Sequence, residues 1–148
     1  MDDASRCSPT AEGRLVGLDP GRSKCGLVRT DRARTTVVDA AILAPEACWT
    51  QLEHWRQAGD LALVVLGNGT GSGPWRQRLG ERVAWRCVPE AGTTLAARQR
   101  YWELEPPRGW RRLLPAGLRL PPRDVDDVVA QLLLERWLGQ NLARTVKL

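Results

Sequence analysis

The sequence contains no phenylalanine, and only one methionine, one histidine and two lysines among its 148 residues. Its four cysteines are scattered without a CxxC pair, which argues against a structural zinc site, because such sites use close-set ligand pairs. No apolar run approaches the roughly 20 residues that a membrane-spanning helix needs. The single histidine, His54, lies in a stretch with helical spacing, so we expect it on a helix surface and not as a catalytic base.

Charge indicates the kind of partner. The net charge is +5, the isoelectric point is about 9.6, and nearly all basic residues are arginine. Arginine binds phosphate through two hydrogen bonds and stacks on bases, so the composition favours nucleic acid over a membrane surface as the binding partner. A biased genome would give the same excess of arginine, and that alternative stays open. The scattered cysteines are expected to be reduced thiols, which predicts a cytoplasmic protein.

The predicted elements indicate one domain. The length and a hydrophobic fraction of 43% fit one buried core, with a polar, disordered leader over residues 1–13 and a single domain over 14–148. Strands are predicted at 15–18, 25–29, 35–43, 61–66 and 82–88, and helices at 45–59, 74–79, from 93 or 94 to 104, and from 124 or 126 to 141. A strand meander followed by alternating elements predicts an α/β fold, a five-stranded mixed sheet with helices on its faces.

Residues 105–123 do not fit this alternation. They contain five prolines and five arginines, which predicts an ordered but irregular loop.

Acidic residues lie where the predicted strands end. Asp19 closes an apolar strand and is followed by a Pro-Gly turn, and Glu90 follows the fifth strand. Asp124, Asp126 and Asp127 crowd the start of the last helix, and which of them would join the other two is open. Carboxylates that meet at one sheet edge repel one another unless a cation lies between them, and such ligands suit Mg²⁺ or Mn²⁺. Each acid also has a plain alternative role, as a turn residue, an exposed strand end or a helix cap.

Glycines and basic residues surround these acids. Gly17 and Gly26 lack side chains, so another element or a substrate can approach closely there. A nucleic-acid surface is predicted from basic residues near the first acid and from arginines interleaved with aromatics: Arg22, Lys24, Arg98, Arg100, Arg111 and Arg112. The glycine-rich loop at 67–73 follows a buried strand, and backbone N–H groups at Asn68 and Thr70 could meet a phosphate, although a plain connecting loop fits better.

Three segments resemble the YqgF/RuvC-like family, and most closely its short, cyanobacterial-type members. GLDPGRSKCGLV at 17–28 is similar to the family's G-I-D-x-G-x-x-x-x-G-x-A pattern. VPEAGTTLAAR at 88–98 looks like the segment D-E-x-x-T-T-x-x-A, with Glu90 as its acid. DDVVAQLLLERWL at 126–138 is similar to D-x-x-A-A-x-x-x-L-x-x-Y-L, with Asp126 on its acid. Pro89, Ala91 and Gln131 depart from these patterns.

The resemblance implies an RNase H-like fold and a metal-dependent nuclease, with Asp19, Glu90 and Asp126 as catalytic residues that bind the metal. It implies cleavage of branched DNA at Holliday junctions or of structured RNA at the 5′ end of pre-16S ribosomal RNA, by a monomer or a homodimer. The departures from the family patterns favour an alternative, a catalytically inert nucleic-acid-binding protein of the same fold. An ATP site of the sugar-kinase type is disfavoured, because it needs two such domains and this length supplies one.

Overall fold

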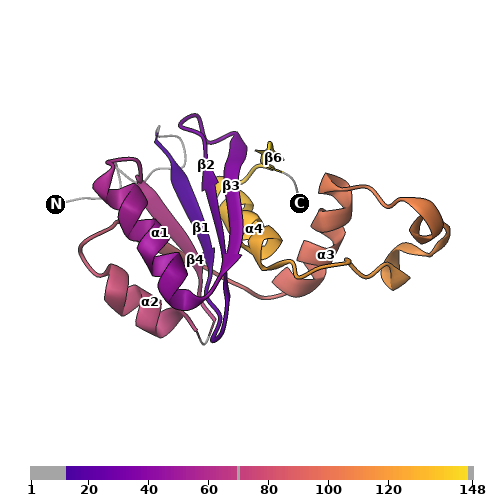
Figure 1. Cartoon of the computed structure of the whole chain (residues 1–148), viewed down its shortest axis with the longest axis horizontal. Helices are drawn as coiled ribbons and strands as arrows, with labels where there is room; N and C mark the ends of the chain where they lie inside the picture. The colour runs from indigo at the N-terminus through magenta and orange to yellow at the C-terminus, as the bar shows by residue number, and fades with distance from the viewer. Residues whose placement is uncertain (1–12, 70, 147–148) are drawn as a thin grey trace.

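One mixed sheet organises the residues that the computed structural model describes, 13–69 and 71–146. Its strands are β1 (Leu15–Asp19), β2 (Cys25–Thr30), β3 (Thr36–Leu43), β4 (Leu63–Gly67), β5 (Trp85–Val88) and β6 (Ala143–Arg144). They lie in the order β5-β4-β1-β2-β3-β6. The helices are α1 (Pro45–Gln57), α2 (Ser72–Leu79), α3 (Thr93–Leu104) and α4 (Asp126–Leu138), and they cover both faces of the sheet (Figure 1).

The strand directions bring three strand ends to one edge. β1 pairs with β2, and β2 with β3, as an antiparallel meander, whereas β4 is parallel to β1 and β5 is parallel to β4. The carboxyl ends of β5, β4 and β1 therefore lie side by side. In sheets of this kind, ligands bind beyond the carboxyl ends of the parallel strands.

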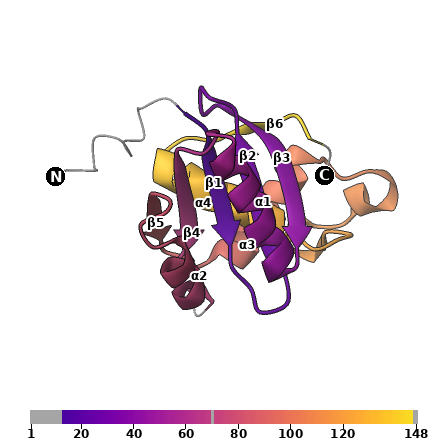
Figure 2. The ribbon, with the colours of Figure 1, turned by 60° about the vertical axis from the view of Figure 1, so that its left-hand side comes forward.

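The two faces of the sheet have separate cores. On one face Val16 and Leu18 pack with α1 and α2, where Leu52, Trp55 and Trp75 are buried. On the other face the opposite residues of β1 pack against α4, which is buried along most of its length. Figure 2 shows α1 in front of the sheet and α4 behind it. This alternation along β1 is what a strand buried on both faces requires.

On the side of α4 that faces away from the sheet, α3 and residues 105–123 form a further layer and a projection (Figure 1). α3 packs on α4 through a small cluster that includes Ala97, Tyr101 and Val129. Residues 105–123 follow, with the short 3₁₀ turns η2 (Gly109–Leu113) and η3 (Ala116–Leu118), and they project furthest from the sheet (Figure 1). No described helix is long and apolar enough to cross a bilayer.

Two glycines allow α4 to lie directly on the sheet. A Cβ at Gly17 would overlap the carbonyl oxygen of Ala130, and a Cβ at Gly26 would overlap the carbonyl group of Asp126. The close approach expected at these glycines is confirmed, and the approaching element is the last helix. This close packing holds the first turn of α4 above the carboxyl end of β1.

The predicted element order is confirmed, but the strand number and several boundaries differ. β5 begins at Trp85 and not at residue 82, and α4 ends at Leu138 and not at residue 141. The sheet has six strands and not five, because the basic tail adds β6 parallel to β3. β6 has only two residues, too few for an alternating pattern to show in the sequence. α2 begins at Ser72, inside the glycine-rich segment, and not at residue 74. The predicted leader at 1–13, apart from Gly13, lies outside the described residues.

Gly26→Ala is expected to lower the free energy of unfolding by about 2 kcal/mol or more, because α4 must move away from β2 to admit the methyl group. Gly73→Ala is the matched control, since a Cβ there meets nothing within 4 Å and lies on a helix. Urea denaturation of both variants measures the difference. Equal stability of Gly26→Ala and the wild type would contradict the close packing described above.

Candidate active site

Asp19 ends β1 between two glycine positions. In the antiparallel register Asp19 is paired with Gly26 of β2. On the other side the parallel register pairs Leu18 with Leu66, which leaves Gly67 at the end of β4 beside the tip of β1. The carboxylate therefore has no neighbouring strand side chain on either flank. The space that these glycines leave open is taken by two further acids.

Glu90 occupies the space above β4. A Cβ at Gly67 or Gly69 would overlap the Glu90 carboxylate, so the side chain reaches back from β5 across the end of the neighbouring strand. The backbone N–H of Glu90 donates to Asn68 Oδ1 at 3.2 Å, which fixes the residue beside this loop. The glycines of the loop thus make room for a carboxylate of the protein itself.

Asp126 reaches the site from the opposite flank. It is the first residue of α4, and its backbone lies against Gly26. Its Oδ2 atom and Glu90 Oε1 are both buried, and neither accepts a hydrogen bond within the described part of the chain. Lys24 Nζ forms an ion pair with Asp126 Oδ2 at 3.6 Å, which is longer than a hydrogen bond. Buried carboxylate oxygens without a donor are unusual, and a cation is one group that would satisfy them.

The charges converge on Asp19. Burial first, and then the negative charges of Glu90 and Asp126, together raise the pKa of Asp19 from 3.8 to about 7. Without a counter-charge, Asp19 thus holds its proton near neutral pH. A divalent cation would compete with that proton, so binding of a cation is expected to strengthen as the pH rises.

The donor set fits a hard divalent cation. Asp19, Glu90 and Asp126 offer only carboxylate oxygens, the donors that Mg²⁺ and Mn²⁺ take together with water. As the side chains lie, no group of three among the described acids, cysteines and histidine is drawn together tightly enough to enclose an ion. Glu90 and Asp126 act electrostatically on Asp19, but side-chain movement is needed before all three carboxylates can ligate one ion.

The two neighbouring acids of α4 have other partners. Asp127 is buried and accepts hydrogen bonds from Arg123 at 2.8 Å and Arg144 at 2.8 Å. Burial alone would raise the pKa of Asp127, but these two guanidinium groups outweigh it and hold the pKa below the usual range. Asp124 is exposed and pairs with Lys24. Of the three candidates for the third acid, only Asp126 acts on Asp19.

A hollow next to Asp126 carries some of the predicted basic residues. Its volume is about 310 Å³, and it lies between the start of α4, the start of α3 and the end of the 105–123 segment. Lys24 and Arg98 line it, and Arg98 is exposed. Arg22 is exposed in the turn after β1, on the other side of Asp19.

The remaining predicted basic residues are divided. Arg111 stacks on Trp110 at 5.0 Å in the projecting segment, and Arg112 is exposed beside it. Arg100 instead faces inward, where its guanidinium binds Glu135 at 2.8 Å and its side chain is 13% exposed. It also donates to the carbonyl of Leu142. Arg100 therefore ties α3 to α4 and the tail, and it does not contribute to an open surface.

Sequence reasoning missed the arginines that fix Asp127. Arg123 precedes Asp127 by four residues, a spacing that brings side chains together on a helical turn and could have revealed the pair. Arg144 lies in the tail and gives no such local signal. His54 is exposed on α1, as expected, and Cys25, Cys48 and Cys87 are free thiols. Cys7 and Thr70 lie outside the described residues.

Comparison with known proteins identifies the fold. No protein-family model matches the sequence, and no curated protein matches it either. Among solved structures, 33 chains match, including RuvC of T. thermophilus in complex with a Holliday junction substrate. That match has a TM-score of 0.50 and 15% sequence identity, and it covers 86% of this chain and 94% of that chain. The fold is therefore RuvC-like, of the RNase H-like type, and at this identity the likeness shows the fold alone.

Asp19→Asn is expected to stabilise the metal-free protein at pH 8, by about 1 to 3 kcal/mol once screening by water is considered. The folded-state pKa lies above the unfolded value of 3.8, so the wild type loses stability as the pH rises from about 4 to about 7. Asparagine removes this loss, and the two proteins should converge below about pH 4. Thermal melts in EDTA across this range measure the effect. Asp124→Asn, with its exposed carboxylate, is the control and should show no such gain. Coincident curves for wild type and Asp19→Asn at pH 8 would contradict the charge convergence.

Proposed function

We propose that this protein is a divalent-metal-dependent endonuclease that hydrolyses phosphodiester bonds in structured nucleic acid. The observation that supports the proposal is the convergence of Asp19, Glu90 and Asp126 at the carboxyl edge of the sheet. Two of these acids carry buried oxygens without a hydrogen-bond donor. Cys25 acts electrostatically on Asp19 but is buried in the core with Cys48, so the donors offered are carboxylates, which suit Mg²⁺ or Mn²⁺ better than zinc.

The three carboxylates would hold the metal ions. Bound there, Mg²⁺ or Mn²⁺ supplies positive charge that activates a water molecule and stabilises the charge developing on the phosphate oxygens. The residues of the chain orient the substrate around that position. Lys24 and Arg98 beside Asp126, and Arg22 beside Asp19, supply donors for the backbone phosphates on either side.

The substrate class is inferred from the fold and the motifs. The structural neighbour RuvC is seen with a Holliday junction, and the sequence motifs resemble the YqgF-type members of the same family. We therefore propose branched DNA or structured RNA, including the 5′ end of pre-16S ribosomal RNA, as the substrate. The free thiols are in keeping with a cytoplasmic protein, acting as a monomer or a homodimer.

An inert nucleic-acid-binding protein is the second candidate. It is favoured by the absence, among the described residues, of three acids already close enough to enclose an ion. Pro89, in place of the acid that precedes Glu90 in the family pattern, supports it as well. The Gln131 departure does not, because Gln131 has a structural role. It donates to the Leu142 carbonyl at 3.2 Å and accepts from Arg144 at 2.9 Å.

The nuclease proposal predicts cleavage in Mg²⁺ or Mn²⁺ of a four-way DNA junction or a pre-16S ribosomal RNA fragment. Asp19→Asn and Asp126→Asn should each lower the rate by at least about 100-fold, because each removes a charge at the reacting position. Asp124→Asn, which changes an exposed acid two residues before α4, is the control and should retain the wild-type rate. Both substrates are offered side by side, and gel-resolved product formation is measured.

Two results would count against the nuclease. Cleavage that survives in Asp19→Asn would rule out this carboxylate as part of the machinery. No cleavage of either substrate, with salt-sensitive binding retained, would favour the inert binding protein.

A further inference from the structure

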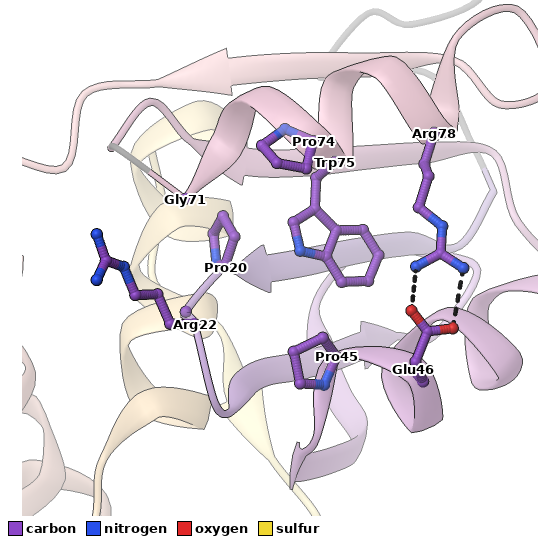
Figure 3. A pocket seen from close by; sticks show the side chains of 9 residues that line it. Pro20, Arg22, Pro45, Glu46, Gly71, Pro74, Trp75 and Arg78 are labelled. Carbon is purple, nitrogen blue, oxygen red and sulfur yellow. Dashed lines mark hydrogen bonds and ion pairs between the residues drawn. The ribbon is translucent and has the colours of Figure 1, made fainter.

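A cavity of about 420 Å³ lies beside the turn that follows β1, and neither Glu90 nor Asp126 lines it. It is formed where the β1–β2 turn meets the first turn of α1 and the start of α2, which cover the face opposite α4 (Figure 3). Its lining consists of Pro20, Gly21, Arg22, Pro45, Glu46, Gly71, Pro74, Trp75 and Arg78. The site described above uses none of these residues except Arg22.

One part of the cavity wall is flat and apolar. Three proline rings line it, at Pro20, Pro45 and Pro74, and the Trp75 ring lies among them, as Figure 3 shows. Proline offers no backbone donor, so these walls present surface for stacking and not for hydrogen bonding. Trp75 is only 5% exposed and is fixed in the core, so it forms a rigid floor while the proline rings supply most of the accessible flat surface.

Charged groups close one end and flank the other. Arg78 donates to both oxygens of Glu46, at 2.8 and 3.1 Å, and this ion pair borders the cavity opposite Pro20 (Figure 3). Arg22 stands at the Pro20 end, and it makes no hydrogen bond or ion pair within the described residues. An exposed guanidinium beside a stacking surface suits a ligand with a flat ring and an adjacent anion.

We infer that this cavity binds one unstacked nucleoside next to the phosphate held at the carboxylates. A volume of about 420 Å³ is within the range of pockets for small flat ligands. Pro20 directly follows Asp19 in the chain, so a strand that crosses the β1 tip places consecutive nucleotides at the acids and in the cavity. The proline rings can contact any base because they make no hydrogen bonds with its edges, and Arg22 binds the phosphate between the two positions.

This inference rests on the proposed nuclease function and narrows its substrate. A base paired inside a duplex cannot enter this cavity, because it would have to leave its stack first. The favoured substrate therefore carries an unpaired or readily unstacked nucleotide beside the cleaved bond. Branch points, bulges and single-stranded ends have such nucleotides, whereas continuous duplex does not.

Photocrosslinking tests the occupant of the cavity directly. The Asp19→Asn protein is mixed with a short single-stranded DNA that carries one 5-iodouracil, irradiated, digested and analysed by mass spectrometry. Crosslinks are expected at Trp75, the aromatic residue of the cavity. The same label inside a blunt duplex is the control and should give no crosslink there. Crosslinks confined to other tryptophans, such as Trp110, would overturn the inference.

A matched pair of arginine variants tests the phosphate contact. Arg22→Gln should weaken binding of the same single strand about fivefold or more, since it removes a charge-assisted hydrogen bond. Arg82→Gln is the control, because Arg82 is exposed and precedes β5, at the opposite edge of the sheet. Its effect should stay below about twofold. Equal effects of the two substitutions would contradict a nucleoside site. The same holds if a proline-rich peptide binds in the cavity without displacing the DNA.

The outcomes separate this inference from the nuclease proposal. If Asp19→Asn crosslinks at Trp75 but the wild type cuts neither substrate, the nuclease proposal is overturned and the nucleoside site is retained. Cleavage by the wild type with crosslinks elsewhere would retain the nuclease and overturn the nucleoside site.

Discussion

The contact between the first turns of α4 and the backbone of the sheet determines the rest of the site. It exists because Gly17 and Gly26 have no side chains, so the helix backbone rests where a Cβ would otherwise lie. This contact places Asp126 above the carboxyl end of β1. Gly67 leaves a similar space on the opposite flank, and Glu90 occupies it. The sheet thus admits two acids around Asp19 by omitting its own side chains.

An ion-pair network fixes the rotation of α4 around this contact. Neighbouring residues on a helix point about 100° apart, so Asp126 and Asp127 cannot both face Asp19. Arg123 and Arg144 hold Asp127 on the far side, with Arg144 only 3% exposed at its side chain. Breaking a buried pair of this kind leaves an uncompensated charge and typically costs 3–5 kcal/mol. The stability of the network therefore sustains an arrangement at Asp19 that is itself unfavourable in the absence of a cation.

The sequence was sufficient for the order of elements because β1 and β4 are short apolar runs with clear ends, and the helices have regular spacing. It also placed Asp19 and Glu90 at strand ends, because strand direction follows from the alternation of elements. Residue spacing alone could not choose among Asp124, Asp126 and Asp127, and only the family resemblance indicated Asp126, since the choice depends on the rotation of α4, which Arg144 sets from the distant tail. β6 is held by the strand beside it and not by its own two residues, and the cavity around Trp75 is assembled from three separate segments.

The most direct test of the account is a calorimetric titration of the wild type and Asp19→Asn with Mn²⁺ at pH 8. If the carboxylates form a cation site, the wild type binds Mn²⁺, Asp19→Asn binds it at least about tenfold more weakly, and Asp124→Asn matches the wild type. Binding of equal strength in the wild type and Asp19→Asn would contradict the account, because the cation would then lie elsewhere on the protein.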